Sequence, residues 1–144
     1  MARVYLVRHA KAEKSSPPGG DAARRLTPEG RAAFAAHARA LALPLRRIVT
    51  SPAVRARETA ELLAAATGAP VEEDEALASG ASSGKELLAL ARKASDAVAF
   101  VGHNPELAEA VALAAGGERE VPPGSVAALE VDASGVALTW VRAP

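Results

Sequence analysis

Three short apolar runs alternate along this chain with longer segments of helical pattern. The runs span residues 3–7, 46–50 and 97–101, and they are rich in the β-branched residues typical of buried strands. Strands that alternate with helices form a mainly parallel sheet with helices on both of its faces. The sequence therefore predicts an α/β protein built as a three-layer α/β/α sandwich.

Three dipeptides indicate where helices begin, because each joins a capping side chain to a proline suited to the first helical position. They are Thr27-Pro28, Ser51-Pro52 and Asn104-Pro105. The corresponding helices are expected to end near Leu41, Ala66 and Gly116-Gly117. A fourth helix is expected over residues 85–94, where leucines recur with helical spacing.

The last part of the chain has a different pattern. Two apolar runs, 126–131 and 136–141, flank the turn-forming residues Asp132-Ala133-Ser134-Gly135, which predicts a C-terminal antiparallel hairpin. Val71-Glu72 indicates a short edge strand. No repeat or linker divides the chain, so residues 1–144 are expected to form one domain.

Composition excludes several classes of function. Lys and Arg number 17, as do Asp and Glu, so no overall field attracts nucleic acid or an anionic membrane. The chain has no cysteine, which excludes a disulfide scaffold, thiol catalysis and cysteine-bound zinc. Because there is neither a signal-peptide pattern nor an apolar run of ~20 residues, we expect a cytoplasmic protein.

Each of the three central runs ends on polar groups suited to bind an anion. Arg8-His9 follows the first run, Ser51 and then Arg55 follow the second, and His103 follows the third. The carboxyl ends of parallel strands meet at one edge of a sheet, where ligands bind in open α/β folds. Arginine binds phosphate or carboxylate with two parallel donors. The spacing alone predicts an anion-binding site of unspecified chemistry.

These residue types also have ordinary structural explanations. A histidine at a strand end is often a packed or capping residue, and an arginine in the first turn of a helix is often solvated. Their occurrence at three strand ends favours a shared site. In such a site, nearby positive charge would lower the pKa of His9, leaving a neutral imidazole that can attack phosphorus.

Four segments of the chain resemble the motifs of the histidine phosphatase superfamily, whose fold is that of the phosphoglycerate mutases. Their order and brevity are similar to the small SixA-type phosphohistidine phosphatase branch, over residues 3 to about 110. The segments are Leu6-Val7-Arg8-His9-Ala10, Leu26-Thr27-Pro28-Glu29-Gly30, Ser51-Pro52-Ala53-Val54-Arg55-Ala56-Arg57-Glu58-Thr59 and Val101-Gly102-His103-Asn104-Pro105. The resemblance implies a phosphorylated nucleophile at His9. It also implies that Arg8, Arg55 and His103 complete a phosphate pocket that needs no metal and no cofactor.

The chain departs from the family pattern at three positions. Ala10 replaces the usual glycine, a change that is tolerated unless the backbone there has a positive φ. Ser15 stands where mutase-like members carry a phosphate-binding asparagine, and it is a candidate substrate-binding residue. Asn104 follows His103 in place of the proton-donating aspartate of the acid-phosphatase branch.

A general acid would therefore have to come from the carboxylates of residues 72–75, as in the mutase-like branch. Glu75, just before Ala76-Leu77, is the preferred candidate, and a solvated acidic loop is the alternative interpretation. A missing acid suits a P–N bond, because imidazole leaves phosphorus more easily than an alkoxide does.

The function that the resemblance implies is hydrolysis of a phosphoryl group through a covalent phosphohistidine on His9. The expected substrate is phosphohistidine in a phosphorylated protein, because a short chain has little sequence from which to build a lid over a small metabolite. Two alternatives are a phosphatase or mutase-like enzyme that acts on a small phosphate ester, and a non-catalytic phosphate-binding module.

Overall fold

The computed structural model describes residues 1–144 and contains one mixed sheet of six strands, in the order β3-β2-β4-β1-β5-β6. The first four strands in the chain run parallel to one another, and the fifth pairs antiparallel with both the first and the sixth, as the sequence predicts. The strands are β1 (Ala2–Arg8), β2 (Arg47–Thr50), β3 (Val71–Glu73), β4 (Val98–Gly102), β5 (Val126–Asp132) and β6 (Gly135–Arg142).

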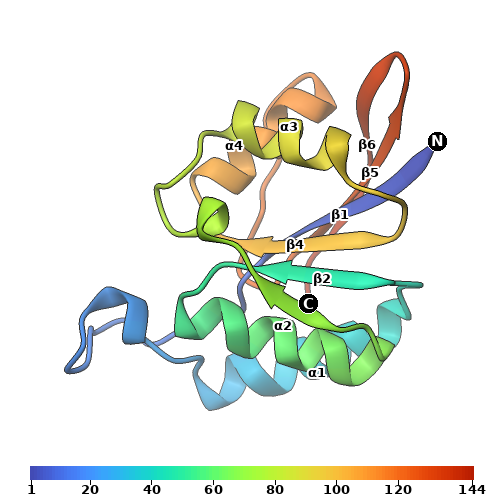
Figure 1. Ribbon diagram of the computed structural model, residues 1–144. Coiled ribbons are helices and arrows are strands. Elements are labelled where there is room, and N and C mark those ends of the chain that lie inside the picture. The colour runs from blue at the N-terminus through green and yellow to red at the C-terminus, as the bar shows by residue number, and fades with distance from the viewer.

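Four helices cover the sheet, two on each face (Figure 1). On one face lie α1 (Pro28–Leu41) and α2 (Val54–Thr67), and on the other lie α3 (Gly84–Lys93) and α4 (Glu106–Ala115). The predicted three-layer α/β/α sandwich with a C-terminal hairpin is confirmed. No helix combines the length and the apolar character that crossing a membrane requires.

The N-terminus of α1 is as predicted, but that of α2 is not. Thr27 caps α1 by accepting a hydrogen bond from the Gly30 N–H at 2.9 Å. The prediction that Ser51 caps α2 is wrong, because the chain continues for two more residues before the helix begins and Ala53 takes the N-cap position. The Ser51 side chain is thereby left for another contact at the sheet edge.

The start of α4 also differs slightly from the prediction. Pro105 is the N-cap residue rather than the first residue of the helix, and its side chain caps nothing. The Asn104 side chain still reaches the first turn, where its Oδ1 accepts a hydrogen bond from the Ala108 N–H at 3.1 Å. Asn104 therefore supports the helix from one position further out.

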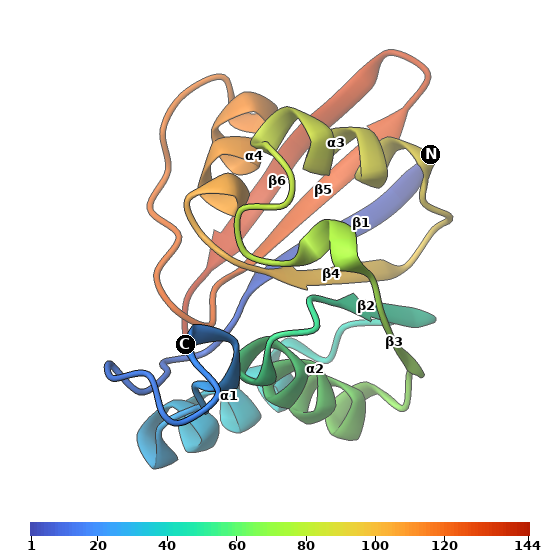
Figure 2. The same cartoon turned by 60° about the vertical axis from the view of Figure 1, so that its left-hand side comes forward.

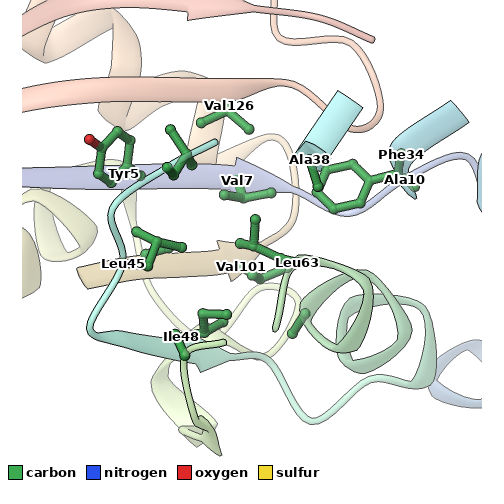
Figure 3. Close-up of a cluster of buried hydrophobic side chains, with 14 of the residues drawn as sticks. Tyr5, Val7, Ala10, Phe34, Ala38, Leu45, Ile48, Leu63, Val101 and Val126 are labelled. Atoms are coloured by element: carbon green, nitrogen blue, oxygen red, sulfur yellow. The ribbon is translucent and has the colours of Figure 1, made fainter. Parts of the chain in front are cut away.

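Two apolar layers form the core, one on each face of the sheet. Because successive side chains of a strand point to opposite faces, Tyr5 and Val7 of β1 pack toward α1 and α2, while Val4 and Leu6 pack toward α3 and α4. Figure 3 shows side chains of the first layer, among them Val7, Phe34 and Val126. Full burial of a side chain such as Phe34 contributes about 2–3 kcal/mol.

Two connections at the carboxyl edge of the parallel strands contain short 3-10 helices. The first is the polar segment 9–27, which projects beyond the ends of β2 and β4 (Figure 2) and includes η1 (Asp21–Ala23). The second follows the edge strand β3 and includes η2 (Glu75–Leu77), which begins just after Asp74 donates its N–H to the Thr50 carbonyl. Both segments therefore border the strand ends to which the sequence assigns a site.

Candidate functional site

The ends of β1, β2 and β4 bring together the side chains that the sequence places at one edge. Main-chain hydrogen bonds join these strand ends. The His9 N–H donates to the Gly102 carbonyl at 3.1 Å, and the Ser51 N–H donates to the Val101 carbonyl at 3.0 Å. The rings of His9 and His103 lie 5.2 Å apart, centre to centre. The predicted proximity of the two histidines is thus a feature of the fold.

Arg55 lies in the first turn of α2, as expected, and is almost fully enclosed at 4% exposure. Its Nε lies 3.4 Å from Nε2 of His9. Its two terminal nitrogens donate to Asp21, Nη1 to the backbone carbonyl at 2.9 Å and Nη2 to the carboxylate at 3.1 Å. The guanidinium is therefore held between η1 and the end of β1.

His9 has one ring nitrogen occupied and one directed at Arg55. Nδ1 lies 2.8 Å from the Ala10 carbonyl oxygen, which can only accept, so Nδ1 carries the proton and Nε2 keeps its lone pair. Burial, reinforced by the charges of Arg55, Arg8 and Arg24, lowers the pKa of His9 to about 4. At neutral pH the ring is an uncharged nucleophile, and burial is a larger cause than the positive charge that the sequence suggested.

His103 is bonded through its other nitrogen. Nε2 lies 2.8 Å from the Ser51 hydroxyl, and Nδ1 is buried without a hydrogen-bond partner. Burial, reinforced by the charge of Arg55, lowers the pKa of His103 to about 3. This ring is therefore also neutral at physiological pH.

Arg8, the last residue of β1, is anchored by one nitrogen only. Its Nη1 donates to the Val121 carbonyl at 2.9 Å, while Nε is buried and has no partner. Burial lowers the pKa of the guanidinium from its ordinary value, although Arg8 remains charged at any physiological pH.

Two residues of the site were missed by the sequence analysis, and both lie in the segment 9–27. Asp21 pairs with Arg55 and also lies 3.5 Å from Nη1 of Arg24. The Arg24 charge is also among the smaller causes that lower the pKa of both His9 and His103. The only sequence signal was two charges, three residues apart, in a loop that leaves a ligand-binding edge.

Glu58 of α2 holds the end of that segment in place. Its carboxylate accepts from the Leu26 N–H at 2.9 Å and pairs with the guanidinium groups of Arg25 and Arg31. Desolvation alone would raise the pKa of Glu58, but the Leu26 N–H and the two guanidinium groups outweigh it and leave that pKa below its ordinary value. Because Leu26 follows Arg24 by two residues, this anchor also restricts where Arg24 can lie.

Two other predicted residues are not brought into contact with this group. Ser15 is exposed in the segment 9–27, and Glu75 is exposed at the start of η2. Neither side chain makes a hydrogen bond or ion pair with Arg8, His9 or His103. Their roles in binding and in proton donation stay predictions. Ala10 has no positive φ, so the backbone there does not require the family's glycine.

Unpartnered polar atoms mark the site more clearly than any hollow. Of four buried side-chain nitrogen and oxygen atoms without a hydrogen bond, three belong to Arg8 (Nε), Arg24 (Nε) and His103 (Nδ1). The neighbouring cavity beside His103 is an apolar gap of about 10 Å³ among Leu77 and Phe100. Buried nitrogens without partners are costly unless a ligand satisfies them, so this arrangement suits a small anion beside His9.

Comparisons with known proteins agree with this geometry. Residues 4–106 match the family model described as histidine phosphatase superfamily, branch 1. No match was found among curated proteins. Among solved structures, the candidate phosphohistidine phosphatase SixA from Agrobacterium tumefaciens superposes with a TM-score of 0.84 at 28% identity, covering 99% of this chain and 98% of that one.

Two further structures share the fold at lower identity. The protein histidine phosphatase SixA complexed with tungstate has a TM-score of 0.84 and 22% identity, covering 99% of this chain and 97% of its own. Phosphoserine phosphatase from Entamoeba histolytica, in complex with 3-phosphoglyceric acid, has a TM-score of 0.76 and 16% identity, covering 100% of this chain and 98% of its own. The same architecture therefore occurs in phosphatases with different named substrates.

Proposed function

Because the chain belongs to the histidine phosphatase superfamily, we propose that it is a SixA-type phosphatase that hydrolyses phosphohistidine in a protein through a covalent intermediate on His9. The observation that carries the proposal is a neutral His9, whose unprotonated Nε2 accepts only a long hydrogen bond from Nε of Arg55, together with three buried nitrogens that have no partner. A tetrahedral phosphoryl group has enough oxygens to satisfy all three.

In the first step, Nε2 of His9 attacks phosphorus. A new N–P bond forms while the bond from phosphorus to the substrate nitrogen breaks, and its electron pair leaves on the substrate ring, which carries a proton on its other nitrogen and departs as neutral imidazole. The proton stays on Nδ1, hydrogen-bonded to the Ala10 carbonyl, so the ring attacks without first losing a proton. Arg8, Arg24, Arg55 and His103 hold the phosphoryl oxygens, and the three guanidinium groups neutralise the charge that these oxygens carry.

In the second step, a water molecule attacks the phosphorus of the intermediate. The bond from phosphorus to Nε2 breaks and its electron pair returns to the ring, while the water's proton leaves with inorganic phosphate. His9 is thereby restored in its starting tautomer. The guanidinium groups are already in place for both steps, so little reorganisation is needed.

A nitrogen leaving group is favoured by the scarcity of free acids in the site. Among the arginines of the site, Arg55 and Arg24 pair with one carboxylate, that of Asp21. Asn104 follows His103, so the strand end supplies no proton donor. Imidazole needs less help from an acid than an alkoxide does. Glu75 is the candidate general acid if esters are also turned over.

A protein substrate is supported by the name of the SixA structure that is 28% identical to this chain and by the short segments that border the strand ends. The segment 9–27 is held at two places, by the pairing of Asp21 in η1 with Arg55 and by the bond from the Leu26 N–H to Glu58. Little free chain is left to enclose a metabolite. A phosphohistidine side chain extended from a protein surface would suit such a site.

The test is to trap the intermediate. The protein is mixed with a radiolabelled phosphohistidine peptide, quenched rapidly and analysed for acid-labile phosphate on His9. The wild-type protein should carry the label and release phosphate, whereas His9→Ala should do neither. Equal turnover by both proteins would rule out the nucleophile.

The same assay separates the alternatives. Faster turnover of phosphoglycerate or a sugar phosphate than of the peptide would indicate a small-molecule phosphatase or mutase-like enzyme. Phosphate binding without any turnover would indicate a recognition module. For Glu75→Gln, a rate loss that is larger on alkyl than on aryl esters would identify Glu75 as the general acid.

A further inference from the structure

Ser51 is a buried hydroxyl whose contacts the expected capping role does not explain. It is fully enclosed after the end of β2, and its Oγ has two neighbours. Nε2 of His103 lies at 2.8 Å, and the Ala53 N–H donates to Oγ at 3.2 Å. The hydroxyl thus links the strand end of β2 to the one at β4.

The position of the hydroxyl proton follows from counting donors and acceptors. The Ala53 N–H already uses one lone pair of Oγ, and the only other hydrogen-bond neighbour of this oxygen is Nε2 of His103. If Nε2 carried a proton, Oγ would accept twice and its own buried proton would have no acceptor. Leaving a buried donor unsatisfied costs about 1–3 kcal/mol. The hydroxyl therefore donates, and Nε2 accepts.

The other ring nitrogen then has a defined state. With Nε2 accepting and the ring neutral, the proton of His103 lies on Nδ1, which is buried and has no partner within the protein. Nδ1 is thus a donor directed at no protein acceptor. In the opposite tautomer, Nδ1 would be a lone pair facing the phosphoryl oxygens, and the contact would be repulsive.

We propose that Ser51 is a positioning residue that holds His103 in the tautomer protonated at Nδ1, so that Nδ1 donates a hydrogen bond to the phosphoryl group. The part concerning phosphate rests on the proposed function, whereas the tautomer is a property of the protein without substrate. Ser51 contacts no substrate in this scheme and acts only through the ring.

The three histidines of the chain allow the tautomer to be measured directly. NMR of ring-labelled histidine shows which nitrogen carries the proton at about pH 7.5, where unperturbed imidazole is neutral and all three pKa values are lowered. His9 provides a reference protonated at Nδ1, because Nδ1 faces the Ala10 carbonyl. His37 provides the opposite reference, because its Nε2 faces the Arg142 carbonyl at 3.1 Å.

In the wild-type protein, the signals of His103 should have the pattern of His9 and not that of His37. In Ser51→Ala, the His103 signals should move toward the His37 pattern or average between the two, while His9 and His37 stay unchanged. A His103 proton on Nε2 in the wild type, or an identical pattern in Ser51→Ala, would overturn the proposal.

Activity provides the second measurement. Ser51→Ala should lower kcat about tenfold to a hundredfold, the range found when a residue that orients a functional imidazole is removed. Ser51→Thr, which keeps the hydroxyl, should restore both the rate and the tautomer. Thr50→Val is the matched control, because it removes a buried hydroxyl that bonds only to the Ser51 carbonyl, and it should alter neither.

The two proposals can fail separately. If the tautomer depends on Ser51 and the wild-type protein hydrolyses no phosphoryl compound, the proposed function fails and the positioning role stands. If the enzyme is active and Ser51→Ala leaves both the tautomer and kcat unchanged, only the positioning role fails.

Discussion

The ends of β1 and β4 carry the same buried ring and hold it in opposite ways. At the end of β1, a backbone carbonyl binds Nδ1 of His9, and the unprotonated Nε2 accepts a long hydrogen bond of 3.4 Å from Nε of Arg55. At the end of β4, a serine hydroxyl binds Nε2 of His103 and leaves Nδ1 without a partner. A single fold edge thus contains one imidazole suited to attack and another suited to donate.

The difference also lies in what can be changed by mutation. The group that binds Nδ1 of His9 belongs to the main chain, so no side-chain substitution removes it directly. The partner of His103 is a side chain and can be removed by a single substitution. The orientation of the proposed nucleophile is therefore built into the backbone, whereas that of the donor depends on the residue at position 51.

The largest expected effect is that of His9→Ala. Removing the nucleophile should lower kcat on a phosphohistidine peptide by at least about 10⁴-fold, because the unprotonated nitrogen of the other ring, Nε2 of His103, is bound to the Ser51 hydroxyl. Thermal unfolding of the variant should stay cooperative, which separates lost chemistry from lost structure. Residual turnover within tenfold of the wild type would contradict the assignment of His9 as nucleophile and of His103 as hydrogen-bond donor.

A smaller loss is expected for His103→Ala. This change removes one hydrogen-bond donor and leaves the nucleophile intact, so kcat should fall by roughly 10²–10³-fold. Acid-labile phosphate should still accumulate on His9 in rapid-quench experiments. A loss as large as that of His9→Ala, with no labelled intermediate, would show that the two rings do not have separate roles.

Arg24 should contribute less than either ring. Arg24→Ala removes a guanidinium with one buried, unpartnered nitrogen, and we expect kcat/KM to fall by about tenfold to a hundredfold. The neighbouring Arg25→Ala is the matched control, since the Arg25 side chain is 68% exposed and pairs with Glu58. Equal effects of the two changes would exclude Arg24 from the site.

The smallest effect concerns stability and pH. The folded-state pKa values of about 4 for His9 and about 3 for His103 lie below the ordinary 6.5. Between pH 6.5 and those values the unfolded chain binds protons that the folded protein does not. The contribution of the two neutral rings to the free energy of unfolding is therefore complete above pH 6.5. As the pH is lowered from 6.5, this contribution decreases by up to about 1.4 kcal/mol per pH unit for each ring.

Urea unfolding between pH 7 and pH 5 measures this slope. His37→Gln is the background for the experiment, because the pKa of His37 is lowered as well and would add to the signal. In that background, His103→Gln should reduce the slope by about half. An unchanged slope would mean that the His103 ring binds a proton as readily in the folded protein as in the unfolded chain, which would contradict the lowered pKa.

The sequence predicted the layers, the sheet and the grouping of His9, Arg55 and His103, because these follow from local patterns and from where parallel strands end. It assigned Ser51 to a helix cap, since nothing local shows that Ala53 takes this position and that His103 lies within reach of the hydroxyl. Asp21 was overlooked for a similar reason. Its pairing with Arg55 depends on the path of a loop that has no periodicity.

The edge strand β3 has a consequence for the behaviour of the chain in concentrated solution. A free sheet edge is a template for pairing with another strand, and natural proteins protect it with short strands and charged side chains. β3 has three residues, two of them glutamates that pair with Arg47 and Arg57. Its shortness and its two charged side chains leave little edge for a second copy to pair with, so this edge resists aggregation.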